Sequence, residues 1–325
     1  MNEWELTHIS PLNLLSKLLY LKFENNLKKI IHFHGSFGDI YLQLSVYSEL
    51  QDASGNLLLI DSKYNSLVIN VKKESDCIAF INSNSLNLEF SKLGILGNNI
   101  ELPIRLLATL YPIIPELLSR CELQYSTFLR FLLNSNNKNQ FKQLENREKT
   151  KFEVEKLFND HNLIKGKTII LSPDNNTQQE FSQEFWSDCI DYIEELNWIP
   201  VLNDSGNLIN NQSKFIFNKN LKKIKIPPHL AVSIPEFAGA YIGGTNGFQT
   251  IQAMFNLSDK GMHLINITSL KNELIEDNFG NKISMATYFH SKAFRNEFLN
   301  KQIEILCLNK FDNFIKNQIK EILTS

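Results

Sequence analysis

The chain has 325 residues, of which 43% are hydrophobic and 21% charged, so it is a globular chain long enough for two domains. Its net charge of −2 gives no reason to expect nucleic acid as a partner. The four cysteines lie far apart with no CxxC spacing, which argues against a zinc site or a disulfide framework and fits a reducing compartment.

The N-terminal segment does not have the pattern of a secretory signal peptide, because Glu3 and Glu5 stand where basic residues are expected. No uncharged run approaches the ~20 residues that a membrane-spanning helix needs. We therefore expect a cytoplasmic protein, with peripheral contact at the inner face of the membrane left open.

The first half of the chain alternates between helical and strand patterns. In chain order we predict a helix at 12–23, a strand at 27–34, a glycine turn at 35–39 followed by a helix, strands at 56–61 and 76–82, and a proline-broken helical region at 102–120. This alternation is typical of a parallel sheet with helices on both faces.

A polar segment at 134–151 is the best linker candidate, although part of it can be helical. After it the alternation restarts, and we predict strands at 167–173, 198–204, 214–218, 240–243 and 262–268, with helices at 185–196, 247–255 and 311–323. Thr177 and either Glu180 or Ser182 are the candidate entry caps of the first of these helices. The interpretation is two Rossmann-like α/β domains, residues 1–145 and 150–310, facing each other across a cleft, with a closing helix at 311–325.

The stretch AYIGGTNGFQTIQAMF, residues 240–255, contains the first candidate site. A strand enters the turn, its glycines permit close backbone approach, and a helix follows whose first N–H groups can bind a phosphate or diphosphate. The residues concerned are Gly243, Gly244, Thr245, Asn246, Gly247, Phe248 and Gln249. The structural alternative is an ordinary tight turn with Asn246 as the helix cap. There is no GxGxxG or GxxxxGK[ST] motif here, which disfavours a dehydrogenase or a P-loop enzyme.

The stretch HFHGSFGDIY, residues 32–41, contains the second. Asp39 follows a glycine turn at the end of a strand, where α/β sheets bind ligands, so it can act as a general base. The alternative is a residue that complements the helix dipole. Neighbours that can contact donor or acceptor are His34, Ser36, Phe37 and Gly38.

A third candidate is the polar loop LSPDNNT, in which Ser172, Asp174, Asn175, Asn176 and Thr177 follow a strand and can bind phosphate or sugar hydroxyls. A simple capped loop is equally consistent with this pattern. Lys222, Lys223 and Lys225 are candidate cations for a diphosphate, or else form a solvated strand edge. His229 is a further candidate, although a lone loop histidine is more often structural.

These three stretches resemble, in order and spacing, motifs of the heptosyltransferase-like glycosyltransferases of family 9, which have the GT-B fold. GSFGDIYLQLSVYSEL resembles the family's S-x-G-D start, and SIPEFAGAYIGGTNGFQTIQAMFN resembles its G-N-D-S-G-x-M-H segment. TIILSPDNNTQQEFSQEFW is similar to its donor-loop segment. The match covers about two thirds of the chain.

The resemblance implies an inverting, metal-independent glycosyltransferase without a cofactor, acting in cell-surface polysaccharide biosynthesis. Asp39 takes the place of the catalytic aspartate, 244–248 that of the diphosphate turn, and 172–177 that of the donor-side loop. A nucleotide-diphosphate sugar would be the donor, and a glycan, lipid-linked saccharide or protein hydroxyl the acceptor.

The chain also departs from the family pattern. Thr177 and Gln178 stand where the family has a basic residue, and Thr245, Asn246 and Thr250 replace its aspartate, serine and histidine. Two alternatives therefore stay open. One is a non-catalytic glycosyltransferase-like partner subunit, and the other is a sugar-nucleotide epimerase of the same architecture.

Overall fold

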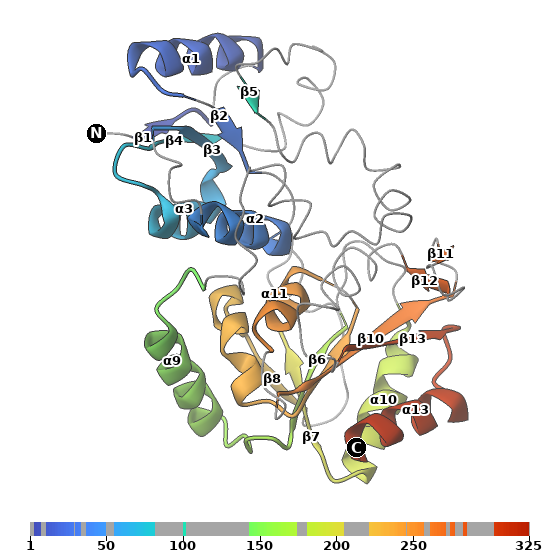
Figure 1. The fold of residues 1–325 in the computed structure, drawn as a ribbon. Coiled ribbons are helices and arrows are strands. Elements are labelled where there is room, and N and C mark those ends of the chain that lie inside the picture. The colour runs from blue at the N-terminus through green and yellow to red at the C-terminus, as the bar shows by residue number, and fades with distance from the viewer. Residues whose placement is uncertain are drawn as a thin grey trace. The chain divides into compact units, whose positions relative to one another are not determined.

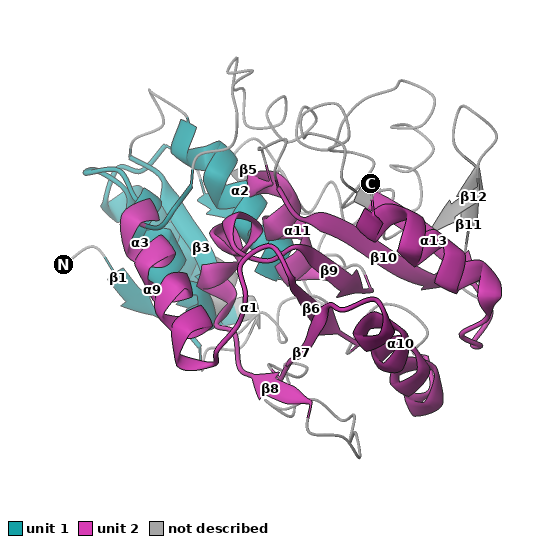
Figure 2. Cartoon of the chain, turned by 90° about the horizontal axis from the view of Figure 1, so that it is seen from below, with its two compact units in different colours: residues 1–145 teal, residues 146–325 magenta. Residues whose placement is uncertain are grey.

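The computed structural model of the protein describes residues 3–7, 11–28, 30–33, 37–49, 55–81, 100–101, 143–173, 181–204, 221–244, 246–256, 261–270, 274–276, 282–284 and 302–324. The chain divides into two compact units, Met1–Glu145 and Asn146–Ser325, which Figure 2 draws in different colours. The main sheet of each unit is parallel throughout. The predicted α/β class is therefore confirmed.

The first unit is a five-stranded sheet with helices beside it (Figure 1). Its elements are β1 (Glu3–Glu5), α1 (Pro11–Glu24), β2 (Ile30–His32), α2 (Phe37–Glu49), β3 (Leu57–Asp61), the 3-10 turn η1 (Ser62–Tyr64), α3 (Asn65–Val71), β4 (Cys77–Ile81) and β5 (Ile100–Glu101). The strand order is β1-β4-β3-β2-β5.

The central strands of this unit are continuous apolar runs because both of their faces are buried. Every residue of β2 and β4 is buried, and so are the first four residues of β3. Successive side chains point to opposite faces. Leu57 and Leu59 therefore join the cluster that includes Leu18 and Leu21 of α1.

The second unit is a six-stranded sheet in the order β13-β10-β9-β6-β7-β8, with a separate antiparallel pair. Its elements are α9 (Arg147–Asp160), β6 (Thr168–Ser172), α10 (Gln183–Glu195), β7 (Ile199–Asn203), β8 (Lys222–Ile224), the 3-10 turns η2 (Pro228–Val232) and η3 (Ile234–Glu236), β9 (Ala240–Gly243), α11 (Gly247–Phe255), β10 (His263–Ser269), the pair β11 (Leu274–Glu276) and β12 (Lys282–Ser284), β13 (Gln302–Cys307) and α13 (Asn313–Thr324).

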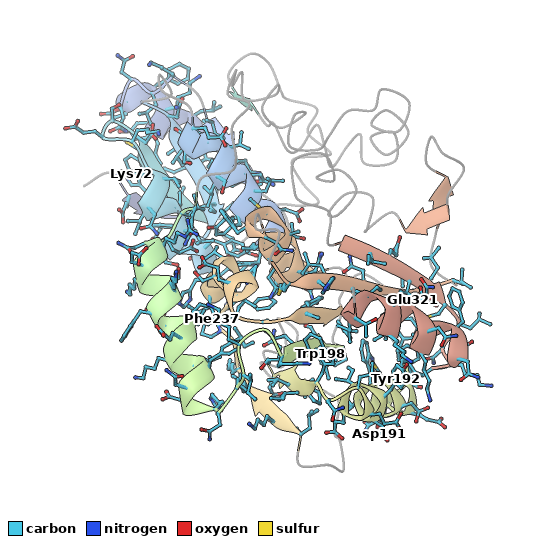
Figure 3. The ribbon with its side chains drawn as sticks, turned by 60° about the horizontal axis from the view of Figure 1, so that its bottom comes forward. Lys72, Asp191, Tyr192, Trp198, Phe237 and Glu321 are labelled. Atoms are coloured by element: carbon cyan, nitrogen blue, oxygen red, sulfur yellow. The ribbon has the colours of Figure 1, made fainter. Side chains whose placement is uncertain are left out.

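Two apolar clusters sandwich this sheet. Ile169 and Leu171 of β6 pack with α10 and α13, whereas Ile170, which lies between them in sequence, packs with α9, η2 and α11. Figure 3 labels Tyr192 on α10 and Glu321 on α13, the two helices of the first cluster. The unit is thus a three-layer α/β/α arrangement.

The ends of α10 and α13 are set by local capping. Ser182 accepts a hydrogen bond from the Phe185 amide at 3.2 Å, which confirms Ser182 as the entry cap of the predicted helix. Asp312 does the same for the amides of Phe314 and Ile315 at 3.1 and 3.2 Å. The buried stripe Ile315, Ile319 and Ile322 then fixes the face that α13 presents to the sheet.

Helix α9 begins inside the segment predicted as a linker. Its apolar signal is weak, because only Thr150, Val154 and Phe158 are buried along 14 residues. Asn146 caps its start, accepting from the Lys149 amide at 3.0 Å. The predicted helical region 102–120 and the predicted strand 214–218 lie outside the described residues. In the described ranges, no helix combines the length and apolar character required to cross a bilayer.

Candidate functional site

The strand order of the second unit defines where a ligand is expected. From β6 the sheet grows through β7 and β8 to one side, and through β9, β10 and β13 to the other. The direction of growth therefore reverses between β6 and β9. In parallel α/β sheets, ligands bind outside the carboxyl ends of the strands at this switch point.

Ser172 and Gly243 end the two strands at the switch point and pair with each other in register. A Cβ atom on Gly243 would stand 2.5 Å from the Ser172 carbonyl oxygen and 2.8 Å from the Tyr241 hydroxyl. No real side chain fits at such distances. Glycine is therefore required at position 243 by the close approach of the β6 and β9 backbones.

Asn246 organises the turn between β9 and α11. Its side-chain oxygen accepts from the Gln249 amide at 2.9 Å, which confirms it as the helix cap. Its side-chain nitrogen donates to the Tyr241 hydroxyl at 3.0 Å and to the Ser172 hydroxyl at 3.4 Å. The Tyr241 hydroxyl in turn donates to the Gly244 carbonyl at 3.1 Å. These bonds tie both strand ends to the start of the helix.

Tyr241 is fully buried, and this burial raises its pKa above the ordinary value for tyrosine, although hydrogen bonds from Ser172 and Asn246 act in the opposite direction. The hydroxyl therefore stays protonated and keeps its role as a donor to the turn.

The first turn of α11 offers backbone donors beside this network. The amides of Gly247 and Phe248 stand at helix positions for which the helix supplies no carbonyl partner, and both residues are half-buried. The helix dipole adds partial positive charge at the same end. An anionic group such as a phosphate suits this position.

Three amide side chains follow one face of α11 at spacings of three and four residues. Gln249 and Gln252 are fully buried, and none of their side-chain nitrogen and oxygen atoms has a hydrogen-bond partner in the described part of the chain. Asn256 donates to the Met262 carbonyl at 2.7 Å, directly before β10, but its side-chain oxygen has no partner among the described residues. Buried amides are normally hydrogen-bonded, so ordered water is a suitable partner for these side chains.

Sequence reasoning missed Asn203, the last residue of β7 and the neighbour of Ser172 at the carboxyl edge. Its side-chain oxygen accepts from the Ile226 amide at 3.3 Å, whereas its buried nitrogen has no partner among the described residues. The signal was present in the sequence, because a polar residue ends the apolar run of β7 as Ser172 ends that of β6. Tyr241 carried no such signal and is recognised only from its contacts.

In the first unit, Asp39 is the third residue of α2 and is half-buried. The helix follows β2, with β3 on one side of that strand and β5 on the other, so it starts at the switch point of this sheet. The end of the unit is tied to the same helix. The Tyr41 hydroxyl accepts from the Leu144 amide at 3.1 Å and donates to the Glu145 carboxylate at 2.5 Å.

Phe37 and Gly38 lie in the first turn of α2 together with Asp39. The other residues predicted beside them, His34 and Ser36, lie outside the described residues. The same holds for Thr245 of the second turn and for the predicted donor loop, Asp174, Asn175, Asn176 and Thr177.

The basic candidate residues have different surroundings in the structure. Lys222 begins the edge strand β8 and donates to the carbonyls of His161 and Asn162 at 2.9 and 3.0 Å, near the end of α9. Lys225 follows the carboxyl end of β8 and is exposed. His229 lies 3.0 Å from the Glu153 carboxylate of α9, so its described contact is with a helix and not with the glycine turn.

Within the described ranges, no three His, Cys, Asp or Glu side chains lie close enough to hold a metal ion together. The three described cysteines, Cys77, Cys189 and Cys307, are buried free thiols. Burial and the nearby Asp312 carboxylate raise the pKa of Cys307 to about 12. Its thiol is therefore not a nucleophile at neutral pH.

Comparison with known proteins places this arrangement among solved folds. No family model matches the chain, and no curated protein matches it in sequence. A glycosyltransferase of family 9 from Veillonella parvula is similar over 90% of this chain and 90% of its own, with a TM-score of 0.51 and 12% identity. The chain has the GT-B glycosyltransferase fold. The resemblance predicted from the motifs is confirmed at the level of the fold.

Two E. coli structures also align with this GT-B chain. ADP-heptose LPS heptosyltransferase II covers 91% of it with a TM-score of 0.45 and 11% identity. The heptosyltransferase WaaC, solved with ADP, covers 91% with a TM-score of 0.48 and 8% identity. In both cases the alignment spans 98% of the E. coli chain.

Proposed function

We propose that the protein is a glycosyltransferase that moves a sugar from a nucleotide-diphosphate sugar to a hydroxyl acceptor, with inversion and without a metal ion. The observation that carries the proposal is the turn between β9 and α11. Gly243 permits the close approach of two strands, and Asn246 holds the start of the helix beside them. The similarity of the fold to a family 9 glycosyltransferase supports the same assignment.

The turn suits a departing diphosphate. As the bond between the sugar and the diphosphate breaks, negative charge grows on the diphosphate oxygens. Backbone donors already aimed at that position stabilise this charge without having to reorient, which is the electrostatic preorganisation common to many enzymes. In this proposal the amides of Gly247 and Phe248 supply those donors.

Asp39 would take the proton from the attacking acceptor hydroxyl. General-base catalysis of this kind typically contributes about 10²–10⁴ to the rate. The hydroxyl oxygen bonds to the anomeric carbon as the diphosphate leaves, so the configuration at that carbon is inverted. Asp39→Asn is expected to keep donor binding and to lose transfer by at least about 10².

The first experiment is a thermal-shift screen of nucleotide-diphosphate sugars, followed by titration calorimetry of the best ligand with Gly243→Ala. The new methyl group must displace the turn, so we expect nucleotide binding at least about tenfold weaker. Gly166→Ala is the matched control. Gly166 has a positive φ of +72°, a backbone conformation that favours glycine. However, no atom lies within 4 Å of a Cβ added there, and the residue precedes β6, at the opposite end of the strand from Ser172.

The control variant is expected to lose some stability through backbone strain while binding the nucleotide normally. If no nucleotide sugar stabilises the wild-type protein, the proposal is wrong. If nucleotide sugars bind but product analysis finds neither transfer nor epimerisation, the non-catalytic subunit is the better assignment.

We further propose a cytoplasmic location with contact between α1 and the inner face of the membrane. Tyr20 and Phe23 of α1 are 55% and 69% exposed. The half-buried Lys17 places its ammonium group 5.0 Å from the centre of the Tyr20 ring. Aromatic and basic side chains on one helix favour binding to anionic lipid headgroups. Flotation with phosphatidylglycerol vesicles should carry the wild-type protein and not Tyr20→Ser/Phe23→Ser; equal flotation of both would refute the contact.

A further inference from the structure

Two carbonyl groups of the turn between β9 and α11 are held by hydroxyls inside the second unit. The Gly244 carbonyl accepts from the Tyr241 hydroxyl at 3.1 Å. The Asn246 carbonyl accepts from the hydroxyl and from the amide of Thr250, both at 2.9 Å. Tyr241 and Thr250 are fully buried. Both carbonyl oxygens are therefore directed towards buried groups of the unit.

The amides of the same turn are arranged differently. The Gln249 amide donates to the Asn246 side chain at 2.9 Å. The amides of Gly247 and Phe248 come before it in the helix, at positions for which the helix supplies no carbonyl partner, and both residues are half-buried. Successive backbone N–H groups of this kind form a concave site that suits an anion.

The direction of the two carbonyls decides how well this site suits a phosphate. A carbonyl oxygen carries partial negative charge, so a carbonyl that faced the phosphate would repel it. In addition, the peptide group between Asn246 and Gly247 is planar and trans, so the Gly247 N–H points away from the Asn246 carbonyl. Holding that carbonyl inwards therefore directs the Gly247 N–H to the opposite side.

The Tyr241 hydroxyl is suited to this task because it makes two hydrogen bonds at once. It donates to the Gly244 carbonyl and accepts from the Asn246 side-chain nitrogen at 3.0 Å. Burial raises the pKa of Tyr241 above its ordinary value, so the proton that it donates stays in place. Removing the hydroxyl would leave both groups without this partner, and a buried carbonyl in that state turns to another donor or to water.

We propose that Tyr241 and Thr250 are positioning residues of the diphosphate site, whose hydroxyls direct the Gly244 and Asn246 carbonyls into the unit so that the turn presents N–H groups to the diphosphate. This inference rests on the proposed glycosyltransferase function and adds two residues to the same site. Neither side chain has to touch the ligand, since each acts through a carbonyl of the turn.

The test compares ligands with and without phosphates. ADP, CDP, GDP, UDP and dTDP, together with the matching nucleosides, are titrated onto the full chain by ligand-observed NMR, a readout that needs no turnover. For each diphosphate that binds the wild type, Tyr241→Phe should weaken binding by about 2- to 12-fold, the range of one net hydrogen bond. Binding of the nucleosides should stay the same, because they have no phosphate for the turn to hold.

A second pair of variants tests the same idea through Thr250. Thr250→Val removes the hydroxyl and should weaken diphosphate binding in the same direction, but by less than Tyr241→Phe, because the Thr250 amide still holds the Asn246 carbonyl. Thr250→Ser keeps a hydroxyl and should restore the affinity. This pair decides the question even if Tyr241→Phe does not fold.

Thr168→Val is the matched control. Thr168 is fully buried and its hydroxyl donates to the Ile164 carbonyl at 2.9 Å, four residues earlier, as Thr250 does to Asn246. It begins β6, at the opposite end of the strand from Ser172. The control should lower the melting temperature by about 2–4 °C, as expected for one buried hydrogen bond, and leave diphosphate binding unchanged.

The outcomes separate this inference from the function on which it rests. If diphosphates bind the wild type but Tyr241→Phe and Thr250→Val bind them equally well, the positioning role is wrong and the proposed function stands. If the variants weaken nucleosides and diphosphates alike, the two hydroxyls only stabilise the fold, and the inference is again wrong. If no nucleoside diphosphate and no nucleotide sugar binds the wild type, the proposed function fails first and the inference fails with it.

Discussion

Asp76 connects three parts of the first unit through hydrogen bonds. Replacing it with alanine should strongly lower the free energy of unfolding of that unit. The side chain is fully buried before β4. One carboxylate oxygen accepts from the Tyr47 hydroxyl of α2 at 2.8 Å and from the Lys73 amide at 3.0 Å. The other accepts from the Asn56 amide, next to β3, at 2.9 Å. Asp76→Ala removes all three hydrogen bonds at once.

The expected cost follows from the groups that are left behind. Hydrogen bonds to a charged partner contribute about 1.5–3 kcal/mol each, and a buried donor without a partner costs about 1–3 kcal/mol. Relaxation and water entry recover part of this sum. We therefore expect a loss of about 3–5 kcal/mol, near the upper end for single substitutions. Asp76→Asn keeps one oxygen acceptor and should lose less.

The assay must resolve the two units, because they need not unfold together. Urea titration gives the total effect, and hydrogen exchange of peptides from β3 and β4, compared with peptides from β6, assigns it to a unit. Asp160→Ala is the control, since Asp160 is exposed at the end of α9 and should change stability by no more than about 0.5 kcal/mol. The reasoning would be refuted if Asp76→Ala lost less than about 1 kcal/mol of stability. It would also be refuted if the substitution increased hydrogen exchange in β6 as much as in β3 and β4.

Two further substitutions probe the second unit. Ser182→Ala removes the acceptor of the Phe185 amide and should cost about 1 kcal/mol in calorimetric unfolding, whereas an unchanged melting temperature would show that the cap contributes nothing. Glu236 forms salt bridges with Arg147 and Lys151, each at 3.1 Å. Burial alone would raise the pKa of Glu236, but the hydrogen bonds from Lys151 and Arg147 lower it below the ordinary value. Because the pKa is lowered, this contribution is present above the unfolded value of about 4.3 and is lost as the pH falls through the folded pKa. Glu236→Gln should therefore be less stable than the wild type at pH 7, by less than about 1 kcal/mol, and this difference should shrink as the pH falls through the folded pKa of Glu236; a pH-independent difference would contradict the assignment.

The elements that the sequence predicted best are those whose cause is local. The runs in β3, β4 and β6 are apolar because parallel central strands are buried on both faces, and this leaves a signal that needs no knowledge of neighbours. The caps at Ser182 and Asn246 are equally local, since each side chain bonds an amide three residues ahead.

Elements with weak local signals were predicted least well. Helix α9 buries only three side chains and begins in the polar segment at 134–151, which was predicted as a linker that can be helical in part, so the extent of the helix was not predicted. Of the candidate site, Asp39, Ser172, Gly243 and Asn246 were predicted from their places after strands, and the described positions agree with those places. Their roles in binding and catalysis remain proposals.

The sequence by itself determined the α/β class, the glycine turns and the local caps, because these depend on contacts within a few residues. Only the tertiary structure decided that β6 and β9 are neighbours, that Gly243 faces the Ser172 carbonyl, and that the Gln249 and Gln252 side chains are buried without partners among the described residues. Strand order and the satisfaction of buried polar groups depend on pairings between residues far apart in the chain. A periodic pattern in one segment carries no information about which other segment will lie beside it.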